Sequence, residues 1–546
     1  MELRSTLRLA LALAALSTSA AAQSSWEGLT LFHPIGGTTT YLIDNAGTVV
    51  HTWASTVSHQ SVYLLEDERL VRTIRGMGPN AEPGVQIVAW DGTVEWDFRY
   101  DLVHHDVEML PNGNILMIAR ESKTPQEAIA AGRNPLTLSG ATFQPEIIIE
   151  VQPTGPTTGS IVWEWHIWDH LVQDFDVGAS NFGVVADQPE LMDVNYPPGM
   201  VGQSGDWNHA NAIAYNAELD QIILNAHHQN EFWIIDHSTT TAEAAGHTGG
   251  TSGKGGDILY RWGNPEAYGA GTTADRQLFG QHNTQWIEDG SPGAGNILIF
   301  NNGNGRPQGD FSSLDELVLP PVDASGNYAL TPGSAYGPAA PVWTYQAAIP
   351  TNFYSAIISG VQRLPNGNTL ACSGTQAWFF EVTPAGDIVW EYQNNFPAGG
   401  NQNVFRARRY RICEDPLNYC VTAPNSMGSG ALIDWTGTAS VSANDLTLQV
   451  SGASATQPGI FYFGDTQPQA PFGDGFRCAG GNVHRLQVVF TDASGNAMHA
   501  LDLTSGQLPT VIDSGDTWNF QYWFRDPTFG GNGFNLSDGL EVLFCN

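Results

Sequence analysis

Two interleaved hairpin patterns restrict the folds open to this chain. In the first, an apolar run leads through Asp, Glu or Pro and then Gly to β-branched residues that close on Trp or Tyr. It occurs six times, at 40–53, 85–98, 146–165, 232–262, more loosely 314–345, and 378–392. The second, such as VEMLPNGNILMIA at 107–119 and VQRLPNGNTLACSG at 361–374, places an Asn-Gly turn between apolar runs. Turns of this kind between apolar runs are typical of β-hairpins.

The two patterns combine into a four-stranded unit that recurs about six times. Four-stranded sheets repeated around an axis form a β-propeller, which leaves only short strand edges exposed. The first unit lacks one hairpin, which residues 28–34 and a returning strand at 404–412 would complete. The sequence therefore predicts an all-β fold with a six-bladed β-propeller over 23–412. A stack of β-sandwiches is the alternative arrangement.

The pattern changes after the propeller repeats. Segments such as ASVSANDLTLQVSG and TWNFQYWFRD alternate apolar and polar residues around turns, which indicates a small accessory β-sandwich over 413–546. This part contains four cysteines, an even number that predicts two disulfides without fixing their pairing. They are Cys413, Cys420, Cys478 and Cys545. The fifth cysteine, Cys372, lies in an apolar strand pattern and is expected to be a buried free thiol.

The amino terminus indicates an exported protein, and the net charge argues against a nucleic-acid partner. Residues 1–22 combine a basic start, an apolar run and small residues in an A-x-A frame, as secretory signal peptides do. We therefore expect a periplasmic or extracellular protein, and no later stretch is apolar enough to span a membrane. The formal net charge is −34, with 21 Lys and Arg against 55 Asp and Glu. Such a chain lacks the basic surface of a nucleic-acid-binding protein.

Polar residues stand just before the second hairpin in five of the repeats. These residues are His59 with Gln60, His104 with His105, His209 with Asn211, His282 with Asn283, and Tyr354 with Ser355. The innermost strand of each propeller blade lines a central channel, so side chains at this position should converge. A histidine that caps a turn would explain any one of them, but five at matching positions predict a site.

The residue types at this predicted site suit group transfer. Neutral imidazole is a nucleophile and a general base near neutral pH, and crowding several together disfavours charging all of them. Protonated neighbours and Asn211 would then donate hydrogen bonds to a charged group with three equatorial oxygens. The same histidines would also suit a metal. However, no H-E-x-x-H motif is present and Asp106 is the obvious carboxylate beside them, so we predict a site without metal or other cofactor.

Several segments resemble the bacterial arylsulfotransferase family, exported enzymes that use aryl sulfates as donors. The matching segments are YLIDNAGTVVHTW, HHDVEMLPNGNIL, DWNHANAIAYN with DQIILNAHHQNEFWIID, QHNTQWI with FNNG, and SGVQRLPNGNTL with EVTPAGDIVWEY. They cover most of 28–410, and the sandwich lies outside the resemblance. The resemblance implies a six-bladed propeller and ping-pong transfer of a sulfuryl group from an aryl sulfate to a phenol, without a nucleotide donor.

The resemblance also implies roles for individual residues. His282 would be the nucleophile that carries the sulfuryl group as sulfohistidine. His209 and Asn211 would hold the sulfuryl and aryl oxygens, with His209 as acid and base for the phenol. His105 would be a further substrate contact, with His104 as its rival.

One residue departs from the family pattern. His227 stands where the family usually has arginine, which is always charged and offers a fixed fork to an oxyanion. The candidate arginines to compensate for this change are Arg306, Arg406, Arg408 and Arg409. The main prediction is therefore an exported arylsulfotransferase that acts on small aryl sulfates and phenols. The alternatives are a non-catalytic secreted propeller that binds a ligand or surface, with the sandwich as an adhesion or sorting module, and a metal-dependent hydrolase built on the same histidines.

Overall fold

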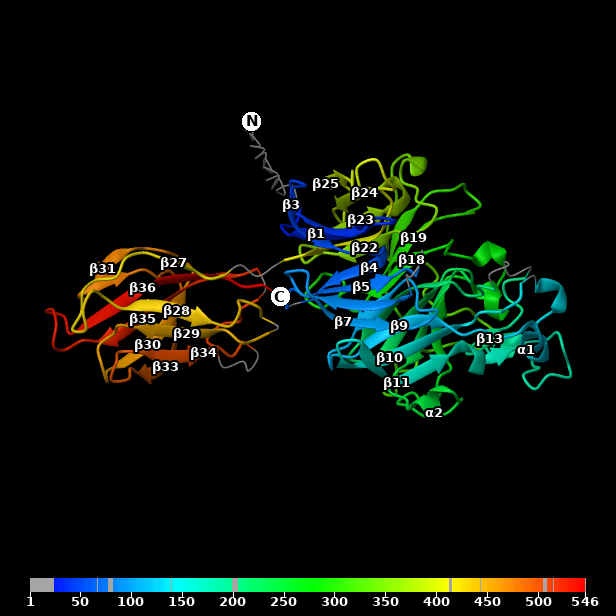
Figure 1. The fold of residues 1–546 in the computed structure, drawn as a ribbon, viewed down its shortest axis with the longest axis horizontal. Coiled ribbons are helices and arrows are strands. Elements are labelled where there is room, and N and C mark those ends of the chain that lie inside the picture. The colour runs from blue at the N-terminus through cyan, green and yellow to red at the C-terminus, as the bar shows by residue number, and fades with distance from the viewer. Residues whose placement is uncertain are drawn as a thin grey trace, which may run out of the picture.

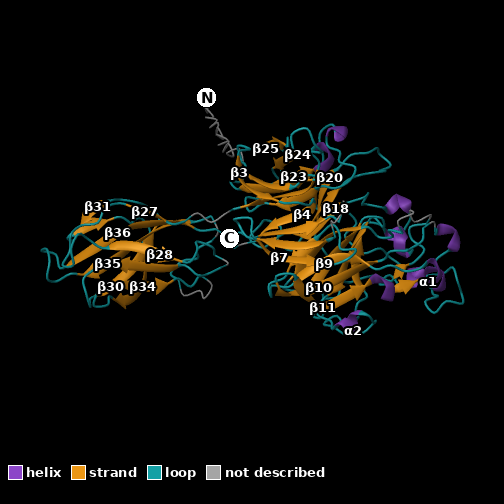
Figure 2. Cartoon of the chain, viewed as in Figure 1, coloured by secondary structure: helices purple, strands orange, loops and turns teal. Residues whose placement is uncertain are grey.

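The protein consists of two separate bodies of β-sheet (Figure 1). The computed structural model describes residues 24–65, 67–76, 82–138, 140–198, 205–411, 415–441, 443–503, 508–513 and 515–545. Strands dominate both bodies, and the short helices lie at the periphery of the larger one (Figure 2). Among these residues no helix is long and apolar enough to cross a membrane. The predicted signal peptide, 1–22, and the predicted domain boundary at 412–413 lie outside the described residues.

The larger body is a six-bladed β-propeller, as the repeats predict. Each blade is an antiparallel sheet of four strands. Strands are given from the inner to the outer one: the first blade contains β26 (Val404–Tyr410), β1 (Leu29–Pro34), β2 (Thr39–Ile43) and β3 (Val49–Ala54), and the second contains β4 (His59–Leu64), β5 (Leu70–Ile74), β6 (Gly84–Val88) and β7 (Val94–Arg99). The third blade contains β8 (Val107–Met109), β9 (Ile115–Arg120), β10 (Glu146–Gly155) and β11 (Thr158–His166), and the fourth contains β14 (Ala210–Asn216), β15 (Gln221–Ala226), β16 (Glu231–Asp236) and β17 (Ile258–Trp262). The fifth blade contains β18 (His282–Trp286), β19 (Ile297–Asn301), β20 (Ser313–Leu317) and β21 (Trp343–Tyr345), and the sixth contains β22 (Gly360–Arg363), β23 (Thr369–Ser373), β24 (Trp378–Val382) and β25 (Ile388–Gln393).

The ring closes through the last strand of the propeller. Strand β26 pairs antiparallel with β1, with Leu31 opposite Arg408, so the first blade contains both ends of the repeat region. This is the returning strand that the sequence predicts at 404–412. Around the axis β26 contacts β4 and β22, and β14 contacts β8 and β18. The Ser61 hydroxyl donates to the His105 carbonyl oxygen at 2.7 Å and joins the second blade to the third.

The aromatic residue that closes each repeat has a specific structural task. In all six blades its indole N–H donates a hydrogen bond to a backbone carbonyl of the following blade, at 2.7–3.2 Å. In order around the ring these bonds are Trp53 to Ala89, Trp96 to Thr158, Trp165 to Gly256, Trp262 to Pro338, Trp343 to Pro384 and Trp390 to Asn45. The bond from Trp390 returns to the first blade and completes the circle. Tryptophan supplies both a large apolar surface and one N–H donor, which explains why the repeat uses it.

Apolar clusters between the blades hold the propeller together. The cluster between the third and fourth blades includes Trp163, Trp207 and Trp233, all less than 5% exposed. Similar clusters fill each of the other blade interfaces. Burial of apolar surface is the main favourable contribution to folding, so the core is distributed around the ring.

Two long connections cover the third and fourth blades on one side. The first carries helix α1 (Pro125–Ala130), capped by Thr124 and Glu127 in a reciprocal capping box. The second contains β12 (Leu171–Val172) and β13 (Met192–Asp193), which pair in parallel, and the short helix α2 (Thr241–Ala244) follows in the fourth blade. A bridge between Gln144 and Asp206 joins the two connections where they return to the propeller.

The smaller body is a β-sandwich. Its five-stranded sheet has the order β27 (Leu417–Tyr419), β36 (Phe534–Leu543), β35 (Thr517–Arg525), β30 (Pro458–Gly464) and β33 (His484–Phe490). A three-stranded sheet of β28 (Leu432–Thr436), β29 (Thr447–Ser451) and β34 (Ala497–Ala500) faces it across one apolar core. The hairpin of β31 (Ala470–Phe472) and β32 (Gly475–Arg477) forms a separate small sheet.

The cysteines follow the predicted division. Cys420 and Cys478 form a disulfide in the sandwich, and Cys545 is also disulfide-bonded. Cys413 lies outside the described residues. Cys372 is a buried free thiol in β23, as predicted, and burial raises the pKa of this thiol well above its usual value.

Candidate active site

Six imidazoles form a continuous cluster beside the inner strands of the propeller. We call His104, His105, His209, His227, His228 and His282 the histidine cluster. The ring centroids of His105 and His209 are 4.7 Å apart, those of His209 and His227 5.3 Å, and those of His227 and His282 5.2 Å. These residues come from the third, fourth and fifth blades, so the propeller fold assembles the cluster from separate parts of the chain.

The backbone at the start of the inner strands helps to turn these side chains. His105, His209 and Asn283 have φ values of 56°, 50° and 49°, in the left-handed region that non-glycine residues seldom adopt. In the sixth blade Ile358 and Ser359 also have positive φ values, of 56° and 102°. A β-branched residue in this region is strained, which makes the segment around Ile358 one of the strained positions beside the cluster.

His282 has its tautomer fixed by its neighbours. Its Nδ1 lies 2.8 Å from Asn302 Oδ1 and 3.2 Å from the Gly280 carbonyl oxygen, which are both acceptors, so Nδ1 carries the proton. Its Nε2 accepts a hydrogen bond from the Ile358 N–H at 3.1 Å, and therefore has the lone pair. Burial lowers the pKa of His282 to about 3, so the ring is neutral at neutral pH.

Asn302 connects His282 to the strained segment of the sixth blade. Its Nδ2 donates to the carbonyl oxygens of Ser355 and Ile358 at 2.7 and 2.8 Å. These two bonds orient the amide so that its oxygen faces His282. Any movement of the segment near Ile358 therefore changes the hydrogen bonds of both ring nitrogens of His282. Nδ1 is affected through Asn302, and Nε2 through the Ile358 N–H.

His209 is oriented by a carboxylate. Its Nδ1 lies 2.6 Å from Asp206 Oδ2, and Arg120 contacts the same oxygen at 3.0 Å. Although burial raises the pKa of Asp206, the hydrogen bond and charge of His209 and the charge of Arg120 hold it below its usual value. The His209 side chain is 30% exposed, and its Nε2 is the nitrogen left to meet a ligand.

His105 is oriented through a second histidine. His104 Nε2 lies 2.8 Å from Glu146 Oε2, and the Nδ1 atoms of His104 and His105 lie 2.6 Å apart. His104 Nε2–H donates a hydrogen bond to the Glu146 carboxylate, so Nδ1 of neutral His104 accepts a hydrogen bond from the Nδ1–H of His105. Burial lowers the pKa of both histidines, while the charge of Glu146 partly opposes this effect at His104. Glu146 also lies 3.5 Å from Arg120, which therefore serves both carboxylates of the cluster.

His227 is a neutral imidazole at neutral pH and provides no positive charge for a sulfate group. Burial and then the neighbouring His282 and His209 lower its pKa well below the usual value, and its buried Nδ1 has no hydrogen-bond partner among the described residues. A neutral imidazole therefore stands where the resemblance leads one to expect arginine.

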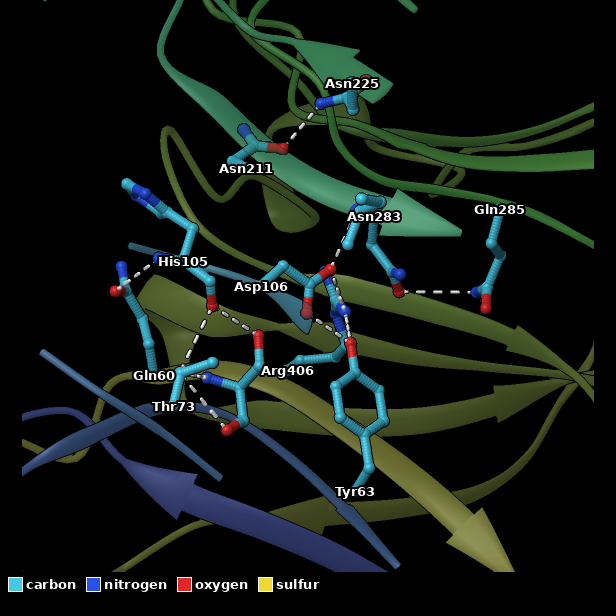
Figure 3. A network of polar contacts seen from close by, with 12 residues as sticks. Gln60, Tyr63, Thr73, His105, Asp106, Asn211, Asn225, Asn283, Gln285 and Arg406 are labelled. Carbon is cyan, nitrogen blue, oxygen red and sulfur yellow. Dashed lines mark hydrogen bonds and ion pairs between the residues drawn. The ribbon is translucent and has the colours of Figure 1, made fainter. Parts of the chain in front are cut away.

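Asn211 lies beside the cluster and links two blades. Its Nδ2 donates to the Gln281 carbonyl oxygen at 3.1 Å, and its Oδ1 accepts from Asn225 Nδ2 at 2.6 Å (Figure 3). Asn225 Nδ2 also donates to the Gln281 carbonyl oxygen, at 3.0 Å, so both amides hold the residue that precedes His282. The second N–H of the Asn211 amide is not used by any of these bonds.

The arginines named from the sequence differ in their location. Arg306 donates to Ser313 at 2.6 Å and stacks over Phe311 with its guanidinium 4.7 Å from the ring centroid. None of its contacts in the described part of the chain is with a histidine of the cluster. Arg406, by contrast, lies on inner strand β26 and is 3% exposed, and its charge contributes to the lowered pKa of His282.

Arg406 is bound by a carboxylate on one side only. Its Nη1 donates to Asp106 Oδ2 at 2.8 Å and contacts the Tyr63 hydroxyl, which itself donates to Asp106 at 2.5 Å (Figure 3). Its Nε and Nη2 are buried without a hydrogen-bond partner in the described residues. Asp106, predicted as the carboxylate beside the histidines, therefore pairs with arginine and tyrosine.

The remaining predicted positions lie next to the cluster or apart from it. His59 packs against His33, with ring centroids 5.0 Å apart, and Gln60 accepts a hydrogen bond from the His105 backbone N–H at 3.3 Å. Ser355 binds the Asn302 amide as described. Sequence reasoning missed Asp206 and Glu146. Asp206 stands three residues before His209 and offered a local signal, whereas Glu146 lies in another strand with none.

The group of side chains with metal-ligand spacing lies outside the cluster. Across the described part of the chain, the three-residue group that meets this criterion is His170, His247 and Asp257. Both His170 Nδ1 and His247 Nδ1 contact the same Asp257 oxygen, at 2.8 and 2.7 Å. Their positions after β11 and before β17 place them between the third and fourth blades, away from His282.

The fold and the cluster together define a propeller protein whose inner strands present imidazoles oriented by carboxylates and amides. The sequence profile described as arylsulfotransferase (ASST) matches residues 21–409. The chain therefore belongs to the arylsulfotransferase family, in agreement with the resemblance found in the motifs.

Individual relatives cover part of the chain. The arylsulfate sulfotransferase AssT of Escherichia coli O6:H1 is 26% identical over 304 residues, which are 52% of this chain and 46% of that protein. The protein of the same name from Lelliottia amnigena is 27% identical over 259 residues, 43% of this chain and 40% of that protein. The chain thus spans less than half the length of these curated relatives.

Solved structures show weaker likeness. A protein of unknown function from Bacteroides caccae aligns with 70% of this chain and 99% of its own, at 11% identity and a TM-score of 0.38. A streptogramin B lyase structure aligns with 67% of this chain and 79% of its own, at 9% identity and a TM-score of 0.32.

Proposed function

We propose that this protein is an exported arylsulfotransferase that moves a sulfuryl group from an aryl sulfate to a phenol through a sulfohistidine at His282. The observation that carries the proposal is the fixed tautomer of His282. Asn302 and Gly280 hold the proton on Nδ1, so Nε2 has the lone pair of a neutral nucleophile. Family membership supports aryl sulfate chemistry, and the other residues of the cluster supply the proton transfers that it requires.

In the first half-reaction His282 Nε2 attacks the sulfur of the aryl sulfate. The N–S bond forms while the bond from sulfur to the aryl oxygen breaks, and the aryl oxygen takes a proton from His209 Nε2. Protonated His209 is stabilised for this role by Asp206 at 2.6 Å. The positive charge that develops on the His282 ring is shared with Asn302, which accepts its Nδ1–H.

In the second half-reaction the acceptor phenol replaces the first aryl group. Neutral His209 takes the phenol proton, the phenol oxygen attacks the sulfur, and the N–S bond to His282 breaks. The products are a phenol from the donor and a new aryl sulfate, and both histidines return to their starting state. No nucleotide and no metal takes part in this cycle.

The sulfuryl oxygens need hydrogen-bond donors. Uptake of one proton by the His104–His105 pair would make His104 an imidazolium beside Glu146 and turn His105 Nε2 into a donor. Further donors are the second N–H of the Asn211 amide, which neither of its described bonds uses, and the Ile358 N–H. Arg406, on the inner strand of the first blade, is the cation that we propose stands in for the charge that His227 lacks, through the Nε and Nη2 atoms that Asp106 does not bind.

The Ile358 N–H must leave His282 Nε2 before attack. In the structure it occupies the lone pair at 3.1 Å, and Ile358 and Ser359 both have positive φ values. Such strain is worth about 1–3 kcal/mol at a residue and favours rearrangement of the segment. We propose that substrate binding shifts this segment, so that the N–H moves from the imidazole to a sulfuryl oxygen.

Export is part of the same proposal. The signal-like residues 1–22 and the disulfide between Cys420 and Cys478 fit an oxidising compartment. Export would be checked by comparing the mass of the amino terminus of the secreted protein with cleavage after Ala22.

The test is transfer from 4-nitrophenyl sulfate to phenol by the purified protein. We expect nitrophenolate release to rise when phenol is added, and mass spectrometry without acceptor to find one SO3 group on the peptide that contains His282. H282N should reduce transfer by at least about 10³-fold and remove the labelled peptide. H247N, at an exposed histidine outside the cluster, is the matched control and should keep full activity.

Two outcomes would decide against the proposal. Full turnover by H282N would remove His282 from the nucleophile role. No transfer with any aryl sulfate, together with saturable binding of a ligand by the propeller, would favour the non-catalytic alternative, for which neutral His227 is the supporting feature. Metal content that tracks activity would favour the hydrolase.

A further inference from the structure

The outer face of the five-stranded sheet in the sandwich is unusually aromatic. Along β30, Phe461 and Phe463 point into the core between the sheets, whereas Ile460 and Tyr462 alternate with them and point outward. The solvent face of an antiparallel sheet usually has polar residues at such positions. Here Tyr462 instead packs with Trp523 and Phe534, in a small apolar cluster separate from the core.

This face forms one side of a groove. The hairpin β31–β32 forms the other side, where the ring centroid of Phe472 lies 5.3 Å from that of Phe534, and Phe534 lies 5.6 Å from Trp523. The groove has a volume of about 500 Å³, within the range of about 300–1,000 Å³ typical of small-molecule sites. Its main polar lining residues are two arginines, Arg477 and Arg485, and none of its lining residues is acidic.

The charge distribution around the groove is the most informative feature. Residues 415–546 contain twelve Asp and Glu but only three basic residues, all arginine: Arg477, Arg485 and Arg525. Two of them line the groove, and the guanidinium of Arg525 lies 5.9 Å from the ring centroid of Trp523, which also lines it. The whole positive charge of an acidic domain is thus gathered around one aromatic surface.

The two lining arginines are available to a ligand. Arg477 donates from Nε to the Ala479 carbonyl oxygen at 3.0 Å, which holds the side chain while leaving its Nη groups free of partners in the described residues. Arg485 is exposed on β33, opposite Tyr462, and makes no side-chain hydrogen bond or ion pair within the described part of the chain. This contrasts with the propeller, where Arg261, Arg363 and Arg409 are each paired with a buried carboxylate.

We propose that this groove binds a small aromatic anion. The ring of the ligand would stack against Trp523 and Phe534, and its sulfate, sulfonate or carboxylate group would receive hydrogen bonds from Arg477 and Arg485. The inference does not depend on transfer by the propeller. If the proposed function is also correct, the ligand class is that of the donor, and the sandwich is a second binding site for it outside the catalytic centre.

Binding is tested by calorimetry on the full-length mature chain with 4-methylbenzenesulfonate, whose carbon–sulfur bond prevents transfer. Two analogues separate the contributions: 4-methylbenzenesulfonamide has the ring without the charge, and methanesulfonate has the charge without the ring. We expect each analogue to bind at least tenfold more weakly than 4-methylbenzenesulfonate. Galacturonic acid, an anion with a sugar ring in place of the aromatic ring, tests whether the groove selects the aromatic ring or the negative charge alone.

Variants locate the site. R485Q should weaken binding at the groove at least fivefold without affecting folding, since this side chain has no structural bond. W523L should weaken binding to a similar extent, and R99Q, at a partly exposed arginine of the propeller, is the charge-matched control. Transfer from 4-nitrophenyl sulfate at saturating donor should be unchanged in R485Q, while H282N should lose transfer and keep the groove site.

The outcomes are distinguishable from failure of the proposed function. Groove binding in a protein without transfer activity would sustain this inference alone. The inference would be overturned by wild-type affinity in both R485Q and W523L, by equal affinity for the uncharged sulfonamide, or by tighter binding of galacturonic acid than of 4-methylbenzenesulfonate.

Discussion

The histidine cluster of the propeller and the groove of the sandwich treat charge in opposite ways. Around the cluster, buried charged side chains have partners: Arg406 pairs with Asp106, and Arg120 pairs with Glu146 and Asp206, while neutral His104 donates a hydrogen bond to Glu146. In the groove, two arginines lie beside aromatic rings, and neither has a carboxylate partner among the described residues. In the propeller, hydrogen bonds fix which imidazole nitrogens carry protons before any substrate binds. In the sandwich, the two arginines remain available to pair with an anionic ligand.

The physical basis of this contrast is desolvation. A buried charge costs several kcal/mol unless it is paired, and a buried imidazole avoids the cost by remaining neutral. The lowered pKa values of His105, His227 and His282 follow from burial first and from mutual repulsion second or later. An exposed arginine has no such cost, but it also contributes little until a ligand excludes water.

The largest effect is expected where one fixed proton position is removed. D206N should lower the turnover rate of aryl sulfate transfer by about 10³-fold, because the amide no longer stabilises protonated His209. As Asp206 acts through His209, the Michaelis constant for the donor should change much less than the turnover rate. D206E should recover part of the rate; equal loss in both parameters would indicate a merely structural role.

The next effect is on stability. R406M should lower the free energy of unfolding of the propeller by about 3–5 kcal/mol, because it leaves the Asp106 carboxylate buried without its cation. Calorimetry should show this as a shift of the propeller transition alone. The double variant R406M/D106L should recover much of the loss, and failure to recover would show that the pair itself stabilises the fold.

A third variant makes the matching perturbation in the sandwich. Removing the disulfide with C420A/C478A should lower the stability of the sandwich by about 2–4 kcal/mol, since the bond closes a loop between residues separated by 58 positions. The propeller transition should not move. C372A, at the free thiol of the propeller, is the control for cysteine replacement, and coupled movement of both transitions would show that the two bodies unfold together.

Acid should destabilise the propeller more than the sandwich. Burial lowers the pKa of His33 to about 4 and that of His282 to about 3, so below pH 6.5 the unfolded chain binds protons that the folded chain does not. The free energy of unfolding that each of these neutral histidines contributes is therefore fully present above pH 6.5 and is lost as the pH falls towards the folded pKa. The loss between pH 7 and pH 5 is about 2 kcal/mol per histidine. His237 acts in the opposite sense, because hydrogen bonds to Asp220 and Glu150 outweigh burial and raise its pKa to about 9. Calorimetric scans between pH 7 and pH 5 would measure the difference, and a propeller transition that does not move would contradict it.

The smallest effect is expected at the exposed arginine. R485Q should change the stability of the sandwich by less than about 0.5 kcal/mol, as surface substitutions without structural bonds usually do. A larger loss in the thermal transition would mean that Arg485 has a structural role, and the binding test would then depend on W523L.

The relation between sequence and fold was direct in the propeller. The Trp-closing repeat predicted six hairpins, and the structure shows why Trp is used, since each indole donates to the next blade. The returning strand at 404–412 was also readable, because only a strand from the end of the repeat could complete the first blade. In the sandwich, alternation predicted strands but not their order, since the partners of β30 and β36 lie far away in the sequence.

The candidate site was readable only in part. His104, His105, His209 and His282 were visible because they recur just before equivalent hairpins, and the strands then bring them together. Glu146 and Asn302 were not visible, because their distances from His104 and His282 depend on how neighbouring strands and blades pack. Arg306 and Arg406 looked alike as candidates, and only the structure separates them.

The sequence by itself determined the repeat, the imidazole and amide side chains at the start of the inner strands and the uneven distribution of positive charge. These are local properties of period and composition, which the chain carries in any conformation. Tertiary structure alone decided which nitrogen of His282 has the lone pair, which carboxylate faces which imidazole and that the arginines of the sandwich meet aromatic rings. Hydrogen bonding and desolvation act over a few ångströms, so these interactions form only when segments distant in the sequence pack against one another.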